Sequence, residues 1–169
     1  MKTAAKLSAL ASMVLMAMSF GIADASAQTR APDAASRQDF ASDAEVRMQI
    51  QAMLAEMKPD QGFMWRPLVR DGVRIAALEI WKRPGRPAVH PDQAEYAIVI
   101  EGTGILVSGG TLLDAEPRYA TLVEGSRIEN GTTRALGPGD VILVPAGVPH
   151  WFGITGDRLV LLGIKLPGK

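Results

Sequence analysis

Two stretches decide the fold, AVHPDQAEYAIVIEGTG (residues 88–104) and GDVILVPAGVPHWFGIT (residues 139–155). Each joins apolar residues typical of β-strands to glycine and proline at turn positions. They also hold both histidines of the chain, His90 and His150, and the carboxylate of Glu95. Two imidazoles and one carboxylate are a recurring ligand set for a divalent transition metal. If the fold brings the two stretches together, the chain has a metal site.

His90 and Glu95 are five residues apart, and on one continuous strand an odd separation places side chains on opposite faces. Pro91-Asp92-Gln93 supplies a turn between them, because proline cannot donate to a ladder and aspartate favours turns. His90 is therefore expected to end one strand and Glu95 to open the next, both pointing inward. From Glu95 onward the expected inward residues are Ala97 and Val99, and the outward ones are Tyr96, Ile98 and Ile100.

The rest of the second half is also typical of β-structure. Candidate strands cover residues 74–82, 94–100, 104–107, 119–123, 126–128, 132–136, 140–144, 150–154 and 159–164. Asn130-Gly131 predicts a two-residue hairpin between two of them. Many short strands separated by turns favour an antiparallel sandwich or a small barrel.

A helix is expected before the strands, at about residues 42–58. Ser42 followed by Glu45 is a capping-box pattern, and apolar residues then recur at helical spacing at Val46, Ile50, Met53, Leu54 and Met57. Such a stripe is typical of a packing surface. This helix or a second subunit is expected to cover the outward apolar face of the strands.

The N-terminus has the layout of a secretory signal peptide, residues 1–27. Lys2 and Lys6 precede an apolar run, and Ala25-Ser26-Ala27 is a small-x-small cleavage pattern. The alternative is an uncleaved membrane anchor, for which the run is short. Residues 28–40 are expected to be a mobile N-terminus, and residues 41–169 a single domain with its barrel at about 65–167. The predicted location is the periplasm or the medium.

Composition narrows the classes of partner. The chain has no cysteine, so disulfides are excluded, and its basic and acidic residues balance at 18 each. No partnership with nucleic acid is expected, nor with a membrane after signal cleavage.

The two stretches resemble the two motifs of the cupin superfamily. The first motif is a His-x-His pair, three or four residues, Glu, six residues and Gly, which His90, Glu95 and Gly102 match. The second is Gly, five residues, Pro-x-Gly, two residues, His, three residues and Asn, matched at Gly139, Pro145, Gly147 and His150. The resemblance implies a cupin-type double-stranded β-helix, a jelly-roll barrel that is usually dimeric, with a divalent metal between its sheets.

Two positions depart from the motifs. Ala88 stands where the first histidine belongs, and Ile154 stands where the final asparagine belongs. The ligand set implied by the resemblance shrinks to His90, Glu95 and His150. An alternative alignment makes His90 the first histidine and Asp92 its partner, but it leaves one residue too few before Glu95.

Loss of one ligand has two interpretations. One is a three-ligand centre with an open position for water, oxygen or substrate, holding one divalent ion of Fe, Mn, Ni, Zn or Cu. The other is a cupin with weakened or absent metal, whose histidines are hydrogen-bonded in the pocket.

The function stays correspondingly open. One hypothesis is a metal-dependent enzyme, an oxygenase, isomerase or lyase, that acts on a small organic molecule. The alternatives are a non-catalytic small-molecule- or metal-binding cupin, a receptor or accessory protein, and a homodimeric structural module. No catalytic base is assigned, although Glu79 and Glu101 lie on or beside pocket strands. Trp65 and Arg66 are candidates for the barrel mouth, with packing for Trp65 and solvent for Arg66 the favoured interpretations.

Overall fold

The structure, a computed structural model, describes residues 37–167. The expected signal peptide (residues 1–27) and most of the expected mobile segment (residues 28–40) lie outside the described residues. The described chain begins with β1 (Arg37–Gln38), which pairs with the end of β2 (Phe63–Asp71). These two residues are therefore tied to the sheet by backbone pairing, where the sequence predicts a mobile chain.

One α-helix, α1 (Asp43–Glu56), lies within residues 37–167, and Ser42 caps it. The Ser42 hydroxyl accepts from the backbone N–H of Glu45 at 3.3 Å, and the Glu45 carboxylate accepts from the backbone N–H of Ser42 at 2.7 Å. The predicted capping box therefore forms. In this part of the chain, no helix has the length and apolar character that a bilayer crossing requires.

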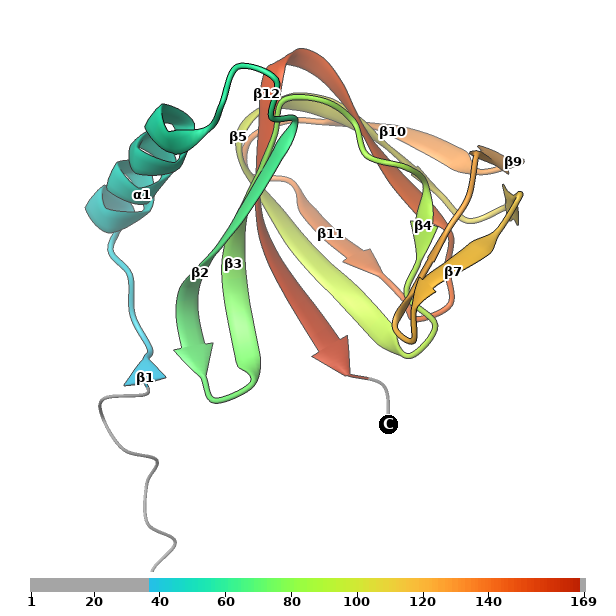
Figure 1. The fold of residues 1–169 in the computed structure, drawn as a ribbon, viewed down its shortest axis with the longest axis horizontal. Helices are drawn as coiled ribbons and strands as arrows, with labels where there is room; N and C mark the ends of the chain where they lie inside the picture. The colour runs from blue at the N-terminus through green and yellow to red at the C-terminus, as the bar shows by residue number, and fades with distance from the viewer. Residues whose placement is uncertain (1–36, 168–169) are drawn as a thin grey trace, which may run out of the picture. The chain divides into compact units, whose positions relative to one another are not determined.

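A hairpin of β2 and β3 (Arg74–Trp81) lies next to α1 (Figure 1). β3 agrees with the strand predicted at residues 74–82, whereas β2 is missing from the prediction. Pro67 lies inside β2, and a proline in an apolar run argues against a strand. The ladder accommodates it by a register shift between Pro67 and Val69.

Two long strands, β5 (Gln93–Ser108) and β12 (His150–Pro167), pair along most of their length. The sequence predicts each of them as two shorter strands. In the structure the chain stays in the sheet, with a register shift between Ile154 and Leu159. Gly102 has a φ of +82°, and a Cβ there would lie 2.0 Å from the carbonyl oxygen of Arg158. Glycine at this position therefore allows the two strands to pair closely.

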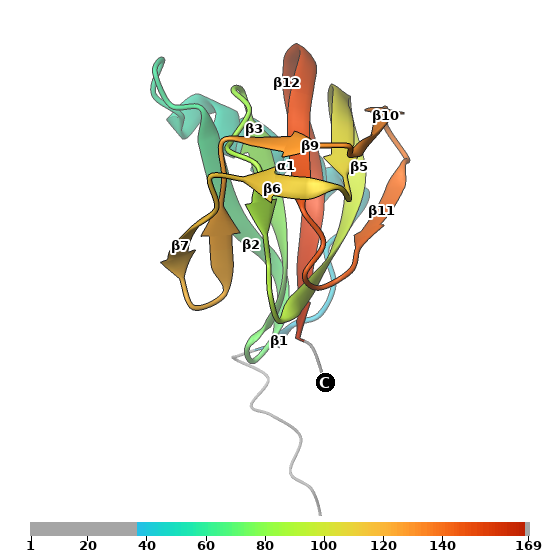
Figure 2. The ribbon, with the colours of Figure 1, turned by 90° about the vertical axis from the view of Figure 1, so that its right-hand side faces the viewer.

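The remaining strands are short: β4 (Ala88–Val89), β6 (Thr111–Leu113), β7 (Glu116–Tyr119), β8 (Leu122–Glu124), β9 (Arg127–Glu129), β10 (Thr132–Leu136) and β11 (Val141–Val144). The hairpin predicted at Asn130-Gly131 is wrong, because β9 pairs with β6 while β10 pairs with β5. Asn130 has a positive φ of 57°, so the chain does turn there. The turn carries it from the small β6–β9 sheet, which lies across the direction of β12 in Figure 2, into the main sheet.

Ten strands of the described chain form one sheet that curls into a barrel with a hydrophobic cluster on each side of its wall. Ala97 and Val99 are buried inside, while Tyr96 and Ile98 are half-buried on the outer face, as their alternation predicts. The outer cluster joins α1 to the barrel wall through Ile50, Met53, Leu78, Ile80 and Val160. The predicted all-β jelly-roll class, with one short helix, is confirmed.

Candidate metal centre

The turn after β4 brings His90 and Glu95 to the same side of the sheet. His90 follows β4, Pro91 and Asp92 form the turn, and β5 begins at Gln93. The carbonyl of His90 accepts from the N–H of Gly147 at 2.8 Å, which ties this turn to the Pro-x-Gly turn of the second stretch. The odd spacing of the two side chains is therefore overcome by the turn, as predicted.

His150 opens β12 and completes the cluster. Its Nε2 lies 3.1 Å from Oε2 of Glu95, and Nε2 of His90 lies 3.5 Å from the same oxygen. One ligand atom from each residue lies within 4.8 Å of the others. The three side chains named from the sequence are therefore brought together, and their binding of a metal stays a prediction.

The backbone fixes both imidazole rings. Nδ1 of His90 lies 3.0 Å from the carbonyl oxygen of Thr121, and Nδ1 of His150 lies 3.1 Å from that of Val148. A carbonyl can only accept, so each Nδ1 carries the proton and donates it. Each Nε2 faces Glu95: it donates to the carboxylate when it carries a proton, and it offers its lone pair to a metal when it does not. Metal-binding histidines are held in the same way, through the ring nitrogen that does not bind the metal.

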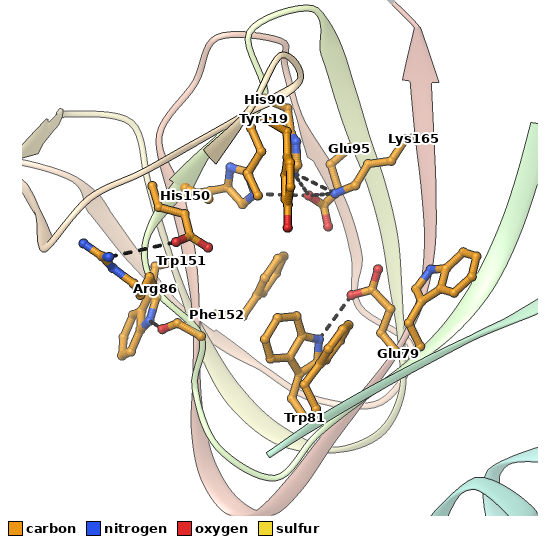
Figure 3. Close-up of a pocket in the computed structure, with 16 residues that line it drawn as sticks. Glu79, Trp81, Arg86, His90, Glu95, Tyr119, His150, Trp151, Phe152 and Lys165 are labelled. Atoms are coloured by element: carbon orange, nitrogen blue, oxygen red, sulfur yellow. Dashed lines mark hydrogen bonds and ion pairs between the residues drawn. The ribbon is translucent and has the colours of Figure 1, made fainter. Parts of the chain in front are cut away.

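Lys165 is a member of the cluster that the sequence did not reveal. Its ammonium donates to Oε2 of Glu95 and lies 2.9 Å from Nε2 of His90 (Figure 3). Lys165 lies opposite Glu95 in the β5–β12 ladder, so the sheet register places it there. The signal was a lysine that directly follows the apolar run of residues 159–164, and its partner could be found only once the register was known.

Glu95 is almost fully buried, with 3% of its surface exposed. Burial raises the pKa of its carboxyl, but hydrogen bonds from His150 and His90 and the charge of Lys165 outweigh that effect and hold the pKa well below its usual value. The carboxylate is therefore ionised at neutral pH. An ionised carboxylate between two oriented imidazoles can hold a divalent cation.

These residues line a cavity of about 580 Å³ inside the barrel (Figure 3). Glu79 of β3 lines the same cavity, is 8% exposed, and accepts from Nε1 of Trp81 at 3.1 Å. Burial raises the pKa of Glu79 to about 7, and the charge of Glu95 acts in the same direction. Glu79 can therefore take up or release a proton near neutral pH. The sequence named it only as a residue beside the pocket.

The other residues considered from the sequence fall into two groups, those that line the cavity and those that do not. Ala88 lies opposite His150 in the ladder and lines the cavity, whereas Asp92 of the alternative alignment is exposed and outside the cluster. Glu101 pairs with Arg158 at 2.8 Å instead of lining the cavity. Arg66 contacts Glu56 on α1, so the structure does not support its use for a substrate.

Two tryptophans lie closer to the site than predicted. Trp65, expected to pack, lines the cavity and is 46% exposed. Alternation along the strand from His150 predicts that Trp151 points away from the site, yet it also lines the cavity, and its Nε1 donates to the carbonyl of Gly85 at 2.9 Å. Ile154, in place of the motif asparagine, packs against the interior cluster.

Comparison with known proteins agrees with this architecture. The model of the cupin family matches residues 85–165, a range that holds all three candidate ligands. The chain has the cupin fold. The match and the barrel together support the cupin superfamily, in agreement with the resemblance of the two motifs.

Solved cupin-fold structures are similar at low identity. Hydroquinone 1,2-dioxygenase PnpCD, solved with Cd²⁺ and 4-hydroxybenzonitrile, is 18% identical, with a TM-score of 0.50 over 70% of this chain and 71% of that chain. KdgF from Halomonas sp. is 17% identical, with a TM-score of 0.46 over 67% of this chain and 87% of that chain. TT1209 from Thermus thermophilus is 18% identical, with a TM-score of 0.48 over 70% of this chain and 95% of that chain. Such likeness concerns the fold alone. No match was found among curated proteins.

Proposed function

We propose that this cupin binds one divalent transition metal through His90, Glu95 and His150 and acts as an enzyme on a small organic molecule in the adjoining cavity. The convergence of two Nε2 atoms and one carboxylate oxygen within 4.8 Å carries the proposal. The class of reaction stays open between oxygenation, isomerisation and lyase chemistry.

The donor set fits such an ion. Imidazole suits Fe, Ni, Cu and Zn, and a carboxylate also admits Mn. The position already attracts a cation, because the Lys165 ammonium lies beside Glu95 and His90. Three protein ligands leave coordination positions for a substrate or water, which is the pattern of catalytic rather than structural metal sites.

A bound metal would supply Lewis acidity at the end of the cavity where the ligands lie. Proton transfer would fall to the chain's own residues. Glu79 can hold or release a proton at its carboxyl, and Trp81 keeps that carboxyl in place by donating to it.

Metal titration of the chelator-treated protein tests the proposal. We expect one equivalent of at least one of Mn²⁺, Fe²⁺, Ni²⁺, Cu²⁺ and Zn²⁺ to bind. His150→Ala should weaken binding by more than about 100-fold, because loss of a residue that only supports a ligand already costs about 10–100-fold. Glu101→Gln removes a carboxylate outside the cavity and should leave the affinity unchanged. Equal binding by His150→Ala and wild type would reject the site.

A second candidate is a non-catalytic binding protein in which Lys165 permanently replaces the metal. The observation in its favour is that the ammonium already satisfies Glu95. Lys165→Met separates the two candidates, since methionine keeps much of the length and loses the charge. If a metal displaces Lys165, removing the charge should tighten metal binding, by about tenfold. If Lys165 replaces the metal, the wild type should bind none, and Lys165→Met should lose stability because Glu95 loses its charged partner.

We also propose export to the periplasm with removal of residues 1–27, on the strength of the signal-peptide pattern. The mature protein should begin at Gln28 and be released by periplasmic extraction, which N-terminal sequencing of that fraction measures. A chain that retains Met1 and sediments with the membranes would contradict the proposal.

A further inference from the structure

Aromatic residues gather around the cavity far beyond their share of the chain. The sequence has nine Phe, Trp and Tyr residues, and six of them line the cavity: Phe63, Trp65, Trp81, Tyr119, Trp151 and Phe152. All three tryptophans are among them. A hydrophobic core needs volume and draws on aliphatic residues equally well, and the barrel interior is in fact filled mainly by aliphatic residues. The packing of the core therefore does not account for the aromatic residues that gather at the cavity.

Several of these rings remain exposed to solvent. Tyr119 is 71% exposed, Trp65 is 46% exposed and Phe63 is 39% exposed. Large exposed apolar side chains grouped at the mouth of a cavity typically mark a binding site. Phe63 and Trp81 face each other with ring centroids 4.2 Å apart, which forms one aromatic wall. Offset and edge-on contacts with such walls favour a planar ring over a puckered one.

The cavity also holds a carboxyl group, that of Glu79, which can accept a hydrogen bond from a ligand. Within residues 37–167, Trp81 is the one hydrogen-bond partner of the buried Glu79 carboxyl, and it engages Oε2. Figure 3 shows this carboxyl facing the cavity. The other oxygen, Oε1, has no hydrogen-bond partner among these residues, so the ionised carboxylate can accept from a ligand O–H or N–H. The cation Lys165 already has a partner in Glu95, so the cavity gives less reason for an anionic ligand.

We infer that the cavity binds a small planar aromatic molecule that carries a hydrogen-bond donor, with its ring between the tryptophans and its donor on Glu79. The volume of about 580 Å³ suits a molecule of one or two rings. The inference rests on the proposed function in that it names the class of molecule on which the site acts, but binding does not require that the metal be present.

Three probes of similar size test separately whether the ligand must be planar and whether it must carry a hydrogen-bond donor. 4-Methylphenol is planar with a donor, 4-methylcyclohexanol is puckered with a donor, and 4-methylanisole is planar without one. Binding can be followed by the tryptophan fluorescence of the purified protein, because every tryptophan lines the cavity. We expect 4-methylphenol to bind at least about tenfold more tightly than either of the others. Equal affinities for 4-methylphenol and 4-methylcyclohexanol would overturn the inference.

Variants locate the probe. Trp65→Leu should weaken 4-methylphenol binding several-fold, while Phe40→Leu, a ring outside the cavity that is 73% exposed, should not. Glu79→Gln should remove the preference for 4-methylphenol over 4-methylanisole, because the single amide oxygen is taken up by Trp81. Glu101→Gln is its matched control. An unchanged preference in Glu79→Gln would exclude Glu79 as the acceptor and reject the inference.

The same titrations, run on chelator-treated and on Zn²⁺-treated protein, keep the two proposals apart. Selective binding of 4-methylphenol by a protein that takes up no metal would support the aromatic site and reject the metal centre. Metal uptake without any selectivity among the probes would support the metal centre and reject the aromatic site.

Discussion

Ala88 is the residue at which this site differs most from the motif that it resembles. It lies opposite His150 in the β4–β12 ladder and lines the cavity. Directly opposite residues of an antiparallel ladder share a face. Ala88→His should therefore add a fourth ligand, a third imidazole, and tighten Zn²⁺ binding by about tenfold or more, measured by competition with a chelator. Val89→His, one residue along and on the opposite face, is the control. No gain from Ala88→His would show that position 88 does not reach the metal.

Glu79 makes stability depend on pH in a direction opposite to that of an ordinary paired carboxylate. Its pKa is raised to about 7 in the folded chain, so the folded state holds the proton more tightly than the unfolded state. The stability that this provides is complete below about pH 4.5 and is lost as the pH rises through 7. Glu79→Gln should therefore be relatively more stable at pH 8 than at pH 5, with a change on the order of 2 kcal/mol between the two.

Urea denaturation of both chelator-treated proteins at pH 5, 6, 7 and 8 measures this difference. The lowered pKa of Glu95 acts below about pH 4.5, outside the range, because its contribution is present above that pH and is lost on acidification. A stability difference that does not vary with pH would contradict the assignment of a raised pKa to Glu79.

For single residues, the sequence was informative only where the residue type itself indicates the chemistry. His90, Glu95 and His150 could be named because histidine is rare in the chain and all three fall at motif positions. Lys165 and Glu79 look like ordinary charged residues, and their roles depend on register and burial. The position of Lys165 opposite Glu95 follows from the pairing of strands 70 residues apart, which no local pattern encodes.

Among the elements, α1 is the one whose contribution to stability can be isolated most cleanly. Met53 is fully buried between α1 and the barrel wall, whereas Met48 of the same helix is 60% exposed. Met53→Ala should cost about 2–4 kcal/mol of unfolding free energy through lost burial and the cavity left behind. Met48→Ala makes the same chemical change and should stay within about 0.5 kcal/mol of wild type. Equal effects in urea denaturation would show that α1 is not docked as described.

Element prediction succeeded where one local signal dominated and failed where pairing overrode it. The capping box at Ser42 and the strand at Thr132–Leu136 are local and were found. β2 was missed because Pro67 argues against a strand, and a register shift absorbs it. β5 was divided at Gly102, where glycine marks close approach of β12 rather than a strand end. At Asn130-Gly131 the turn is real, but its flanking strands pair elsewhere.

For the whole molecule, the expected homodimer has a candidate surface. Val141 and Leu143 of β11 are 60% and 59% exposed, and they lie opposite Ile98 and Tyr96 of β5. A second copy that packs on this apolar face would bury these exposed side chains. We expect wild type to be dimeric by light scattering and the Val141→Glu/Leu143→Glu variant to be monomeric. Val73→Glu, on the turn between β2 and β3, should remain dimeric. A monomeric wild type would remove the proposal.

X-ray absorption at the Zn edge of Zn²⁺-loaded protein tests the three-ligand centre most directly. The predicted spectrum shows one shell of N and O atoms at about 2.0–2.1 Å, with outer-shell scattering from two imidazole rings. His150→Ala should reduce the imidazole contribution to that of one ring. A zinc shell without imidazole scattering, or with the same scattering in His150→Ala, would contradict a metal centre built from His90, Glu95 and His150.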